Sequence, residues 1–173
     1  MRTLILLRHA KSSWDHPELA DHDRPLNKRG RRSAPAIAAW LAERGHQPDT
    51  VLCSSARRAQ ETAERVRKAF PELPEPEVER GLYHATPAVL SARLARLDDA
   101  CRSAMVIGHE PGLGAFAHTL TNGRAEPGCA RAFEHFPTAA AAIIALEIES
   151  WAALDRGIGT LVDFAVPREL TAN

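Results

Sequence analysis

The sequence predicts an α/β fold, a three-layer sandwich in which a mostly parallel central sheet has helices on both of its faces. Three short apolar runs, beginning at residues 3, 50 and 104, are bounded by polar residues, as is typical of strands that are buried on both faces. Segments with helical periodicity separate these runs along the chain. This alternation of strand and helix favours parallel strands that are joined by helical crossovers.

The first run, TLILL at residues 3–7, precedes a polar, Asp-rich stretch over residues 16–25 that has a proline near each end. Such a stretch predicts a long loop, and long loops inside a compact domain are usually functional. Apolar side chains at helical spacing, among them Trp40 and Leu41, then predict a helix over residues 26–44 that ends at a glycine.

Two further units of strand and helix follow. The run at residues 50–54 leads into a helix whose Ala59, Ala63 and Val66 share one face. The run at residues 104–109 leads into a predicted helix, and Pro111 is well suited to its first turn. The helix after the second run is predicted over residues 56–70. A proline-rich connection over 71–79 then leads to a helix over 87–97 that begins after the capping-type Thr86. The helix after the third run is predicted to begin at Pro111.

The last third of the chain holds two segments with alternating apolar residues. Residues 139–149 are rich in alanine, which favours a helix, but Ile144, Leu146 and Ile148 alternate with smaller or polar residues, which favours a strand. Residues 159–166 alternate in the same way. We therefore expect both segments to be strands, paired antiparallel at one side of the sheet, with a turn near residues 155–157 between them.

Length and charge limit the class of protein. A chain of 173 residues is long enough for one domain with a real core and too short for two of ordinary size, so we expect a single domain over residues 1–173. Lysine and arginine together number 22, as do aspartate and glutamate. This balance gives no overall field that would attract nucleic acid or an anionic membrane, and we expect neither as a partner.

The cysteines and the N-terminus indicate the compartment. Cys53, Cys101 and Cys129 have an odd count and no CxxC spacing, which suggests neither a disulfide framework nor a zinc ribbon. Only four apolar residues, LILL, separate the first charged residue from the next, which is too few for a signal sequence or a membrane span. We expect a cytoplasmic location.

Basic residues follow the three clearest strands at the point where each strand ends. The first strand ends at Arg8 and His9, the second leads through serines to Arg57 and Arg58, and the third ends at His109. In open α/β sheets, ligands bind outside the carboxyl ends of the strands. One histidine after a strand is most often a solvated or core residue, but this coincidence at three strand ends favours a shared site.

Such a set of residues suits a phosphoryl group. Arginine is a planar fork that matches phosphate oxygens, and a helix N-terminus adds free N–H donors. A histidine beside these cations is kept neutral and keeps its lone pair for attack on phosphorus. A second histidine donates hydrogen bonds to the oxygens as charge shifts in the transition state.

Several motifs resemble the histidine phosphatase superfamily, which has the phosphoglycerate mutase-like fold, and more closely its small SixA-like phosphohistidine phosphatases. The motifs run in order from residue 8 to residue 114 and are RHAKSSWD, DRPLNKRG, SSARRAQETA, LYHA and VIGHEPGL. The resemblance implies that His9 is a nucleophile that forms a phosphohistidine intermediate. It also implies that Arg8, Arg58 and His109 hold the phosphoryl oxygens, because the family pattern places its arginine directly before Ala-x-x-Thr and so selects Arg58 over Arg57.

The resemblance leaves the general acid open. Mutase-type members have a glutamate near the position of Gly81, so Glu79 is one candidate and Glu110, directly after His109, is another. A glutamate before a proline at a helix start is also a common cap. His84 either lines the pocket or lies in a surface loop, and Lys11 is either a rim contact for the phosphate or a solvated lysine.

The sequence favours a metal-independent phosphatase that acts on phosphohistidine in a protein. A chain of this length has little room for the insertions with which larger members recognise small phosphates. The alternatives are a small-molecule phosphomonoesterase and a non-catalytic module that binds phosphate or a phosphoprotein. A metal-dependent hydrolase is disfavoured, since the strand ends lack HxxxH, HxH or DxD spacing, and we expect no metal ion or other cofactor.

Overall fold

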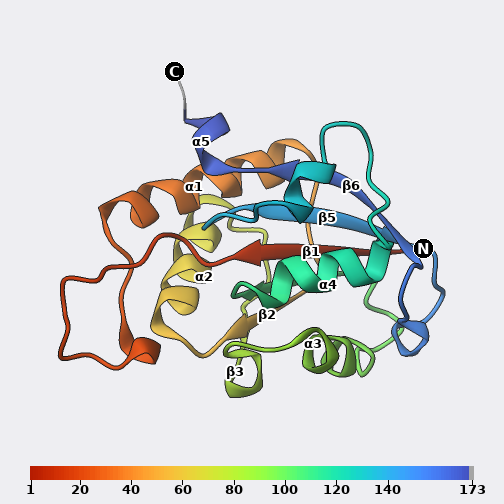
Figure 1. Ribbon diagram of the computed structural model, residues 1–173, viewed down its shortest axis with the longest axis horizontal. Coiled ribbons are helices and arrows are strands. Elements are labelled where there is room, and N and C mark those ends of the chain that lie inside the picture. The colour runs from red at the N-terminus through yellow and green to blue at the C-terminus, as the bar shows by residue number, and fades with distance from the viewer. Residues whose placement is uncertain (172–173) are drawn as a thin grey trace.

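The computed structural model describes residues 1–171 and contains a six-stranded sheet with helices on both faces (Figure 1). The strand order is β3-β2-β4-β1-β5-β6. The strands are β1 (Arg2–Arg8), β2 (Thr50–Ser54), β3 (Glu77–Glu79), β4 (Ser103–Gly108), β5 (Ala141–Leu146) and β6 (Gly159–Ala165). The predicted three-layer α/β sandwich is confirmed.

The sheet is parallel except at β5. β1 and β2 both pair parallel with β4, and β3 pairs parallel with β2. β5 is antiparallel to β1 on one side and to β6 on the other, so the predicted antiparallel pair at one side of the sheet is confirmed. The turn between β5 and β6 contains Arg156 and Gly157, as expected. The alanines near residue 139 therefore do not make a helix.

The helices form two layers. They are α1 (Lys28–Glu43), α2 (Arg57–Ala69), α3 (Pro87–Leu94), α4 (Gly112–Thr121) and α5 (Pro167–Leu170). Four 3-10 segments lie between the main elements, η1 (Asp21–Asp23), η2 (Arg80–Leu82), η3 (Ala130–Phe133) and η4 (Trp151–Ala153). None of the helices within residues 1–171 is long and apolar enough to cross a bilayer.

Alternate residues of β1 face the two layers. Leu4 and Leu6 pack in the core under α3 and α4, whereas Ile5 and Leu7 pack in the core under α1 and α2. All of these side chains are fully buried, and burial of such a side chain contributes about 1.5–3 kcal/mol. The two cores clamp β1 from both sides, so the residues at its carboxyl end have a fixed position.

Two predictions about local structure need correction. The proline-rich connection over residues 71–79 ends in strand β3, whose exposed three-residue sequence EVE gives no periodic signal. The helix predicted over 87–97 ends at Leu94, because the chain passes into a turn there. The other predicted helices lie within two residues of their expected starts, and Asn27 caps α1 by accepting a hydrogen bond from the backbone N–H of Gly30 (2.9 Å).

Candidate active site

The topology brings the three predicted strand ends to one edge of the sheet. β4 lies between β2 and β1, and all three strands run in the same direction. The carboxyl ends of β1, β4 and β2 therefore place His9, His109 and Ser54 side by side. The imidazole rings of His9 and His109 have their centroids 5.2 Å apart.

His9 is held with one ring nitrogen unprotonated. Its Nδ1 lies 2.8 Å from the backbone oxygen of Ala10. A carbonyl only accepts, so Nδ1 carries the proton and Nε2 keeps its lone pair. Arg58 donates from Nε to this Nε2 at 3.4 Å. Burial and the positive charges of Arg58 and Arg8 lower the pKa of His9 to about 3, although its bond to Ala10 opposes this shift.

His109 is also buried and neutral. Its Nε2 lies 2.7 Å from the hydroxyl oxygen of Ser54, and its Nδ1 lies 3.5 Å from Nη2 of Arg58. Burial lowers the pKa of His109 to about 2, with further contributions from His9 and Arg58. Both histidines are therefore uncharged at pH 7, and each ring keeps a single proton.

Arg58 lies at the centre of the cluster and is only 2% exposed. It is the second residue of α2, where the helix start follows directly from the end of β2. Its Nη1 donates to the backbone oxygen of Asp21 (2.7 Å), and its Nη2 donates to the Asp21 carboxylate (3.0 Å). The guanidinium group thus binds Asp21 at one end and faces both histidines.

The Asp21 carboxylate accepts hydrogen bonds from residues in separate parts of the chain. It accepts hydrogen bonds from Arg58, from the hydroxyl group of Tyr83 and from Nε2 of His84 (3.1 Å). Burial alone would raise the pKa of Asp21, but the hydrogen bonds from Tyr83, His84 and Arg58 hold it well below its usual range. The ionised form of the Asp21 side chain is therefore strongly stabilised.

Arg8 has a donor with no partner. Its Nη1 donates to the backbone oxygen of Phe136 (3.0 Å), which orients the side chain. Its Nε is buried and makes no hydrogen bond to any group within residues 1–171. Buried donors are nearly always satisfied. Nε and Nη1 of Arg2, at the other end of β1, also lack a partner, so it is the place of the Arg8 Nε on the residue next to His9 that makes it a candidate donor to an oxyanion.

Thr62 links the segment after β1 to α2 through hydrogen bonds. Its hydroxyl group accepts from the backbone N–H of Ala10 (2.9 Å) and donates to the backbone oxygen of Arg58 (2.7 Å). One side chain thus fixes both the segment that carries His9 and the turn that carries Arg58. This gives a physical reason for the threonine in the motif RAQET.

The loop between β1 and α1 closes beside the site. Arg24 is buried, donates to the hydroxyl of Ser12 (2.7 Å) and stacks on the ring of Trp14 at 3.6 Å. At Gly30 a Cβ atom would lie 2.2 Å from the backbone oxygen of Lys11, so only glycine fits where α1 meets this loop. The segment from residue 23 to residue 30 therefore closes the loop beside the site and leads into α1.

The remaining predicted residues have different surroundings. His84 joins the cluster, because its ring lies 4.7 Å from that of His109 and its Nε2 contacts Asp21. Lys11 is exposed, and its side chain makes no hydrogen bond or ion pair with any described residue. Arg57 is turned outward and pairs with Glu61 at 3.5 Å, which agrees with its predicted place outside the cluster.

The two candidate acids differ clearly. The Glu79 carboxylate receives hydrogen bonds from Nε of Arg93 at 2.8 and 3.0 Å, so it is paired with α3 and not with the histidines. Glu110 is half-buried and accepts from the backbone N–H of Gly114 at 2.5 Å, as a helix cap does. Burial raises the pKa of Glu110, partly opposed by that hydrogen bond and by the charge of Arg8.

Three residues of this site are absent from the set predicted from sequence. Asp21 binds Arg58, Ser54 contacts His109, and the ring of Tyr83 lies 5.5 Å from that of His109. Tyr83 lies in LYHA and Ser54 in SSARRAQETA, so the motifs contain them without indicating their contacts. Asp21 lies in a loop without periodicity, and its only signal is the richness of that loop in aspartate.

The arrangement fits an oxyanion. Arg58 Nε lies 3.4 Å from the unprotonated Nε2 of His9, the rings of His109 and His84 lie beside it in turn, and the charge of Arg8 also acts on His9. No group of three or more histidine, cysteine, aspartate or glutamate side chains in the described part of the chain is placed to hold a metal ion. Positive charge and N–H donors in a buried site stabilise a phosphoryl group as its charge redistributes.

Comparisons with known proteins agree with this chemistry. The family model for the histidine phosphatase superfamily (branch 1) matches residues 4–83. An uncharacterized protein of Mycobacterium tuberculosis is 37% identical over 164 residues, which cover 94% of this chain and 100% of the relative.

Solved structures extend the similarity over the whole fold. One assigned as phosphohistidine phosphatase SixA from Nakamurella multipartitia has a TM-score of 0.81 at 28% identity and covers 96% of each chain. The protein histidine phosphatase SixA complexed with tungstate has a TM-score of 0.80 at 27% identity and covers 98% of this chain and 99% of its own.

Proposed function

The chain belongs to the histidine phosphatase superfamily, and on that premise we propose that it is a metal-independent phosphatase that works through a phosphohistidine intermediate. The observation that carries this proposal is the state of His9. Its Nδ1 is protonated and bonded to Ala10, and its unprotonated Nε2 lies beside the Arg58 guanidinium group. A nucleophilic nitrogen needs this combination of a free lone pair and a nearby cationic anchor.

In the first step, the lone pair of His9 Nε2 attacks phosphorus and the bond from phosphorus to the leaving group breaks. The leaving group departs with the electron pair of that bond and takes up a proton. In the second step, water attacks the phosphohistidine, the P–N bond breaks, and inorganic phosphate leaves. His9 then has its original protonation state, with the proton on Nδ1.

The other residues hold the phosphoryl oxygens. Arg8 offers the buried Nε that lacks a partner, and Arg58 lies next to the attacking nitrogen. A guanidinium group only donates, so Arg58 Nη2 donates to His109 Nδ1 (3.5 Å) and the proton of the neutral His109 ring lies on Nε2. That N–H is donated to the Ser54 hydroxyl oxygen (2.7 Å), which fixes the orientation of the ring beside His9.

Glu110 is the better of the two candidates for the proton donor. Burial raises its pKa, which keeps a carboxylic acid protonated at higher pH, whereas Glu79 is bound by Arg93. Replacing Glu110 with glutamine keeps the shape of the side chain and removes the acid. We expect this change to lower kcat and to leave the formation of the fold intact.

The proposed substrate is phosphohistidine in a protein. Support comes from the SixA structures, which match this chain over nearly its whole length, and from the exposed position of His84 beside the ring of His109. A single domain over residues 1–173 is part of the proposal, because both cores share one sheet. A cytoplasmic location also belongs to it, since Cys53, Cys101 and Cys129 are free thiols.

A panel of substrates tests the proposal. It contains a phosphohistidine protein, free phosphohistidine, and several sugar and glycerate phosphates, each assayed with and without excess EDTA. We expect the highest kcat/KM for the phosphohistidine protein and full activity in EDTA. A clear preference for one metabolite would instead identify a small-molecule phosphomonoesterase, and loss of activity in EDTA would contradict metal independence.

A further inference from the structure

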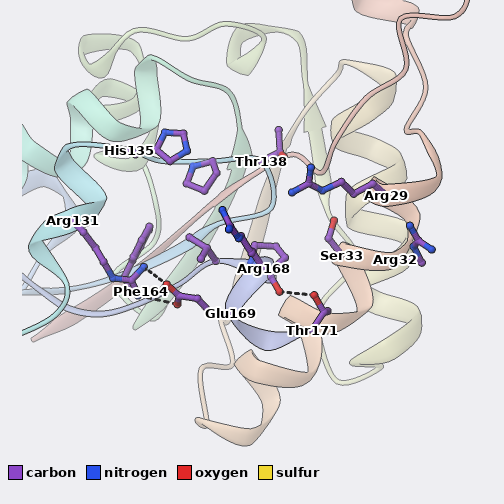
Figure 2. A pocket seen from close by; sticks show the side chains of 13 residues that line it. Arg29, Arg32, Ser33, Arg131, His135, Thr138, Phe164, Arg168, Glu169 and Thr171 are labelled. Carbon is purple, nitrogen blue, oxygen red and sulfur yellow. Dashed lines mark hydrogen bonds and ion pairs between the residues drawn. The ribbon is translucent and has the colours of Figure 1, made fainter. Parts of the chain in front are cut away.

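A large basic pocket lies between α1, α5 and the segment that precedes β5 (Figure 2). Its volume is about 1010 Å³. Figure 2 shows Arg29 and Arg32 of α1 on one side, Arg131 and His135 on the other, and Arg168 of α5 between them. Side chains from three separate parts of the chain thus surround one hollow.

The pocket carries a local excess of positive charge. Among the described residues, four arginines line it, against a single acid, Glu169. Arg131 binds that acid through two hydrogen bonds of 2.7 and 3.0 Å. Arg29, Arg32 and Arg168 are exposed and make no ion pair with any residue from 1 to 171. Because the whole chain has no net charge, this excess is a property of this surface and not of the protein in general.

The pocket is too large for a phosphate ion, and its floor is apolar. Phe164, Val166, Pro167 and Pro137 all line it. The guanidinium group of Arg131 lies 4.9 Å over the ring of Phe164. A volume of this size is at the upper end of the range for ligand sites, about 300–1,000 Å³. An apolar floor with a basic rim fits a stretch of polypeptide that has both acidic and apolar side chains.

One wall of the pocket is the segment that positions the proposed catalytic residues. Pro137 and Thr138 line the pocket. The residue before them, Phe136, accepts the hydrogen bond from Arg8, and the residue after them, Ala139, donates its N–H to the backbone oxygens of Arg8 (3.1 Å) and His9 (3.0 Å). A ligand in the pocket therefore lies one backbone segment away from the reacting nitrogen.

We propose that this pocket docks an acidic segment of the phosphorylated protein while its phosphohistidine occupies the site at His9. The inference rests on the proposed function and adds the class of substrate, namely a phosphohistidine protein with acidic residues near the modified histidine. Exposed complementary charges chiefly steer the encounter and select among partners. The pocket thus distinguishes acidic phosphoproteins from neutral ones and does not take part in the chemical step.

The test compares two pairs of charge reversals. The pocket pair is Arg29→Glu with Arg168→Glu. The control pair is Arg96→Glu with Arg102→Glu, which changes the charge equally at exposed residues that precede β4, away from the carboxyl edge of the sheet. All four side chains are exposed, so neither pair of changes disturbs the core.

Three substrates are assayed with each protein: a phosphohistidine peptide with an acidic flank, the same peptide with glutamine in place of the acids, and free phosphohistidine. The pocket pair should lower kcat/KM for the acidic peptide by about tenfold through KM, because two rim charges together contribute about 1.4 kcal/mol. The other two substrates should be unchanged in both variants. The advantage of the acidic peptide should also shrink as ionic strength rises, because salt screens exposed charges.

Several outcomes would overturn the proposal. One is equal kcat/KM of the wild type for the acidic and the neutral peptide, and another is an equal loss in the control pair, which would indicate a general field. Loss of activity on free phosphohistidine in the pocket pair alone would assign these arginines to the phosphoryl site.

A binding assay distinguishes a failure of this inference from a failure of the proposed function. Fluorescence anisotropy with a labelled acidic peptide that carries no phosphate should show binding to wild type and weaker binding to the pocket pair, even if no phosphohistidine substrate is hydrolysed. Displacement of the labelled peptide by citrate at equal concentration would assign the pocket to a small polyanion and contradict the docking of a protein segment.

Discussion

Arg2 and Arg58 are both almost completely buried, at 3% and 2% exposure, but they lie at opposite edges of the sheet and have different partners. Arg2, at the amino end of β1, donates through Nη2 to the backbone oxygens of Asp99 (3.0 Å) and Glu149 (2.5 Å). Arg58, at the carboxyl edge, donates to the Asp21 carboxylate and to His9 Nε2.

This difference distinguishes an arginine that stabilises the fold from one that belongs to the candidate active site. The partners of Arg2 are carbonyls that do not titrate, so its positive charge only joins chain segments. Arg58 binds one backbone oxygen, that of Asp21, but its other partners are groups that titrate, and its charge contributes to the lowered pKa of Asp21, His9 and His109. A buried arginine therefore indicates a reactive site only where its neighbours have perturbed pKa values.

The sharpest test of this comparison replaces each arginine with methionine, which keeps the apolar stem. Arg58→Met should lower kcat/KM by about 10³, because removing one donor from a developing anion typically costs this much. Arg2→Met should leave kcat/KM of the folded protein within about twofold and lower the free energy of unfolding by about 1–2 kcal/mol, because charged hydrogen bonds to carbonyls are lost.

Steady-state kinetics and urea denaturation of the two variants measure these effects. The comparison fails if Arg2→Met reduces kcat/KM as much as Arg58→Met does. It also fails if Arg58→Met is fully active.

The second prediction concerns pH. The unfolded chain protonates His9 and His109 as the pH falls below about 6.5, but the folded protein does not do so until about pH 3 and pH 2. The unfolded state therefore binds more protons in this window, and stability is lost as the pH falls from about 6.5 towards 3. Each histidine contributes at most about 1.4 kcal/mol per pH unit.

Urea denaturation between pH 7 and pH 5 measures this loss. His9→Asn should lose less stability over this range than the wild type, whereas His118→Asn, at an exposed position on α4, should match the wild type. Equal slopes for the wild type and His9→Asn would show that His9 is not held neutral by the fold.

The third prediction isolates the positioning of His109. Ser54→Ala removes the hydroxyl group that lies 2.7 Å from His109 Nε2. We expect kcat to fall by about tenfold with little change in KM, since one hydrogen bond contributes about 1–1.5 kcal/mol. Ser55→Ala, at the next residue, removes a hydroxyl that contacts His22 and should leave kcat unchanged. An equal fall in both variants would contradict the role of Ser54.

The fourth and smallest effect concerns Asp21. Its carboxylate uses the same donors of Arg58 and His84 that an incoming oxyanion needs. Asp21→Asn removes this competing charge and should tighten inhibition by tungstate or inorganic phosphate about three- to tenfold, as for an exposed charge pair of about 1 kcal/mol. Asp23→Asn, two residues further along η1, serves as the matched control. Weaker inhibition in Asp21→Asn would instead mean that Asp21 only holds Arg58 in place.

The sequence predicts the parts of the structure that depend on local pattern. The continuous apolar runs of β1, β2 and β4 indicate strands buried on both faces, and the shared direction of these strands then brings His9, Arg58 and His109 together. Strand β3 escapes prediction because its three residues lie largely exposed at the edge of the sheet and owe their conformation to pairing with β2.

The rest of the site depends on contacts between distant residues. Asp21 contacts Arg58 and Tyr83, which are 37 and 62 positions away in the sequence. A loop without periodicity gives no indication of which of its carboxylates points inward. Glu79 similarly has the right residue type near the expected place, but only the structure shows its pairing with Arg93.

The central claim is that His9 becomes phosphorylated, and trapping the phosphoenzyme tests it most directly. Wild type and His9→Ala are mixed with a ³²P-labelled phosphohistidine protein, quenched in alkali, and separated on a denaturing gel. We predict a labelled band at the mass of the enzyme in the wild type, which is lost on brief treatment with acid, and no label at that mass in His9→Ala. An equal label in both proteins, or turnover by His9→Ala at the rate of the wild type, would contradict the account.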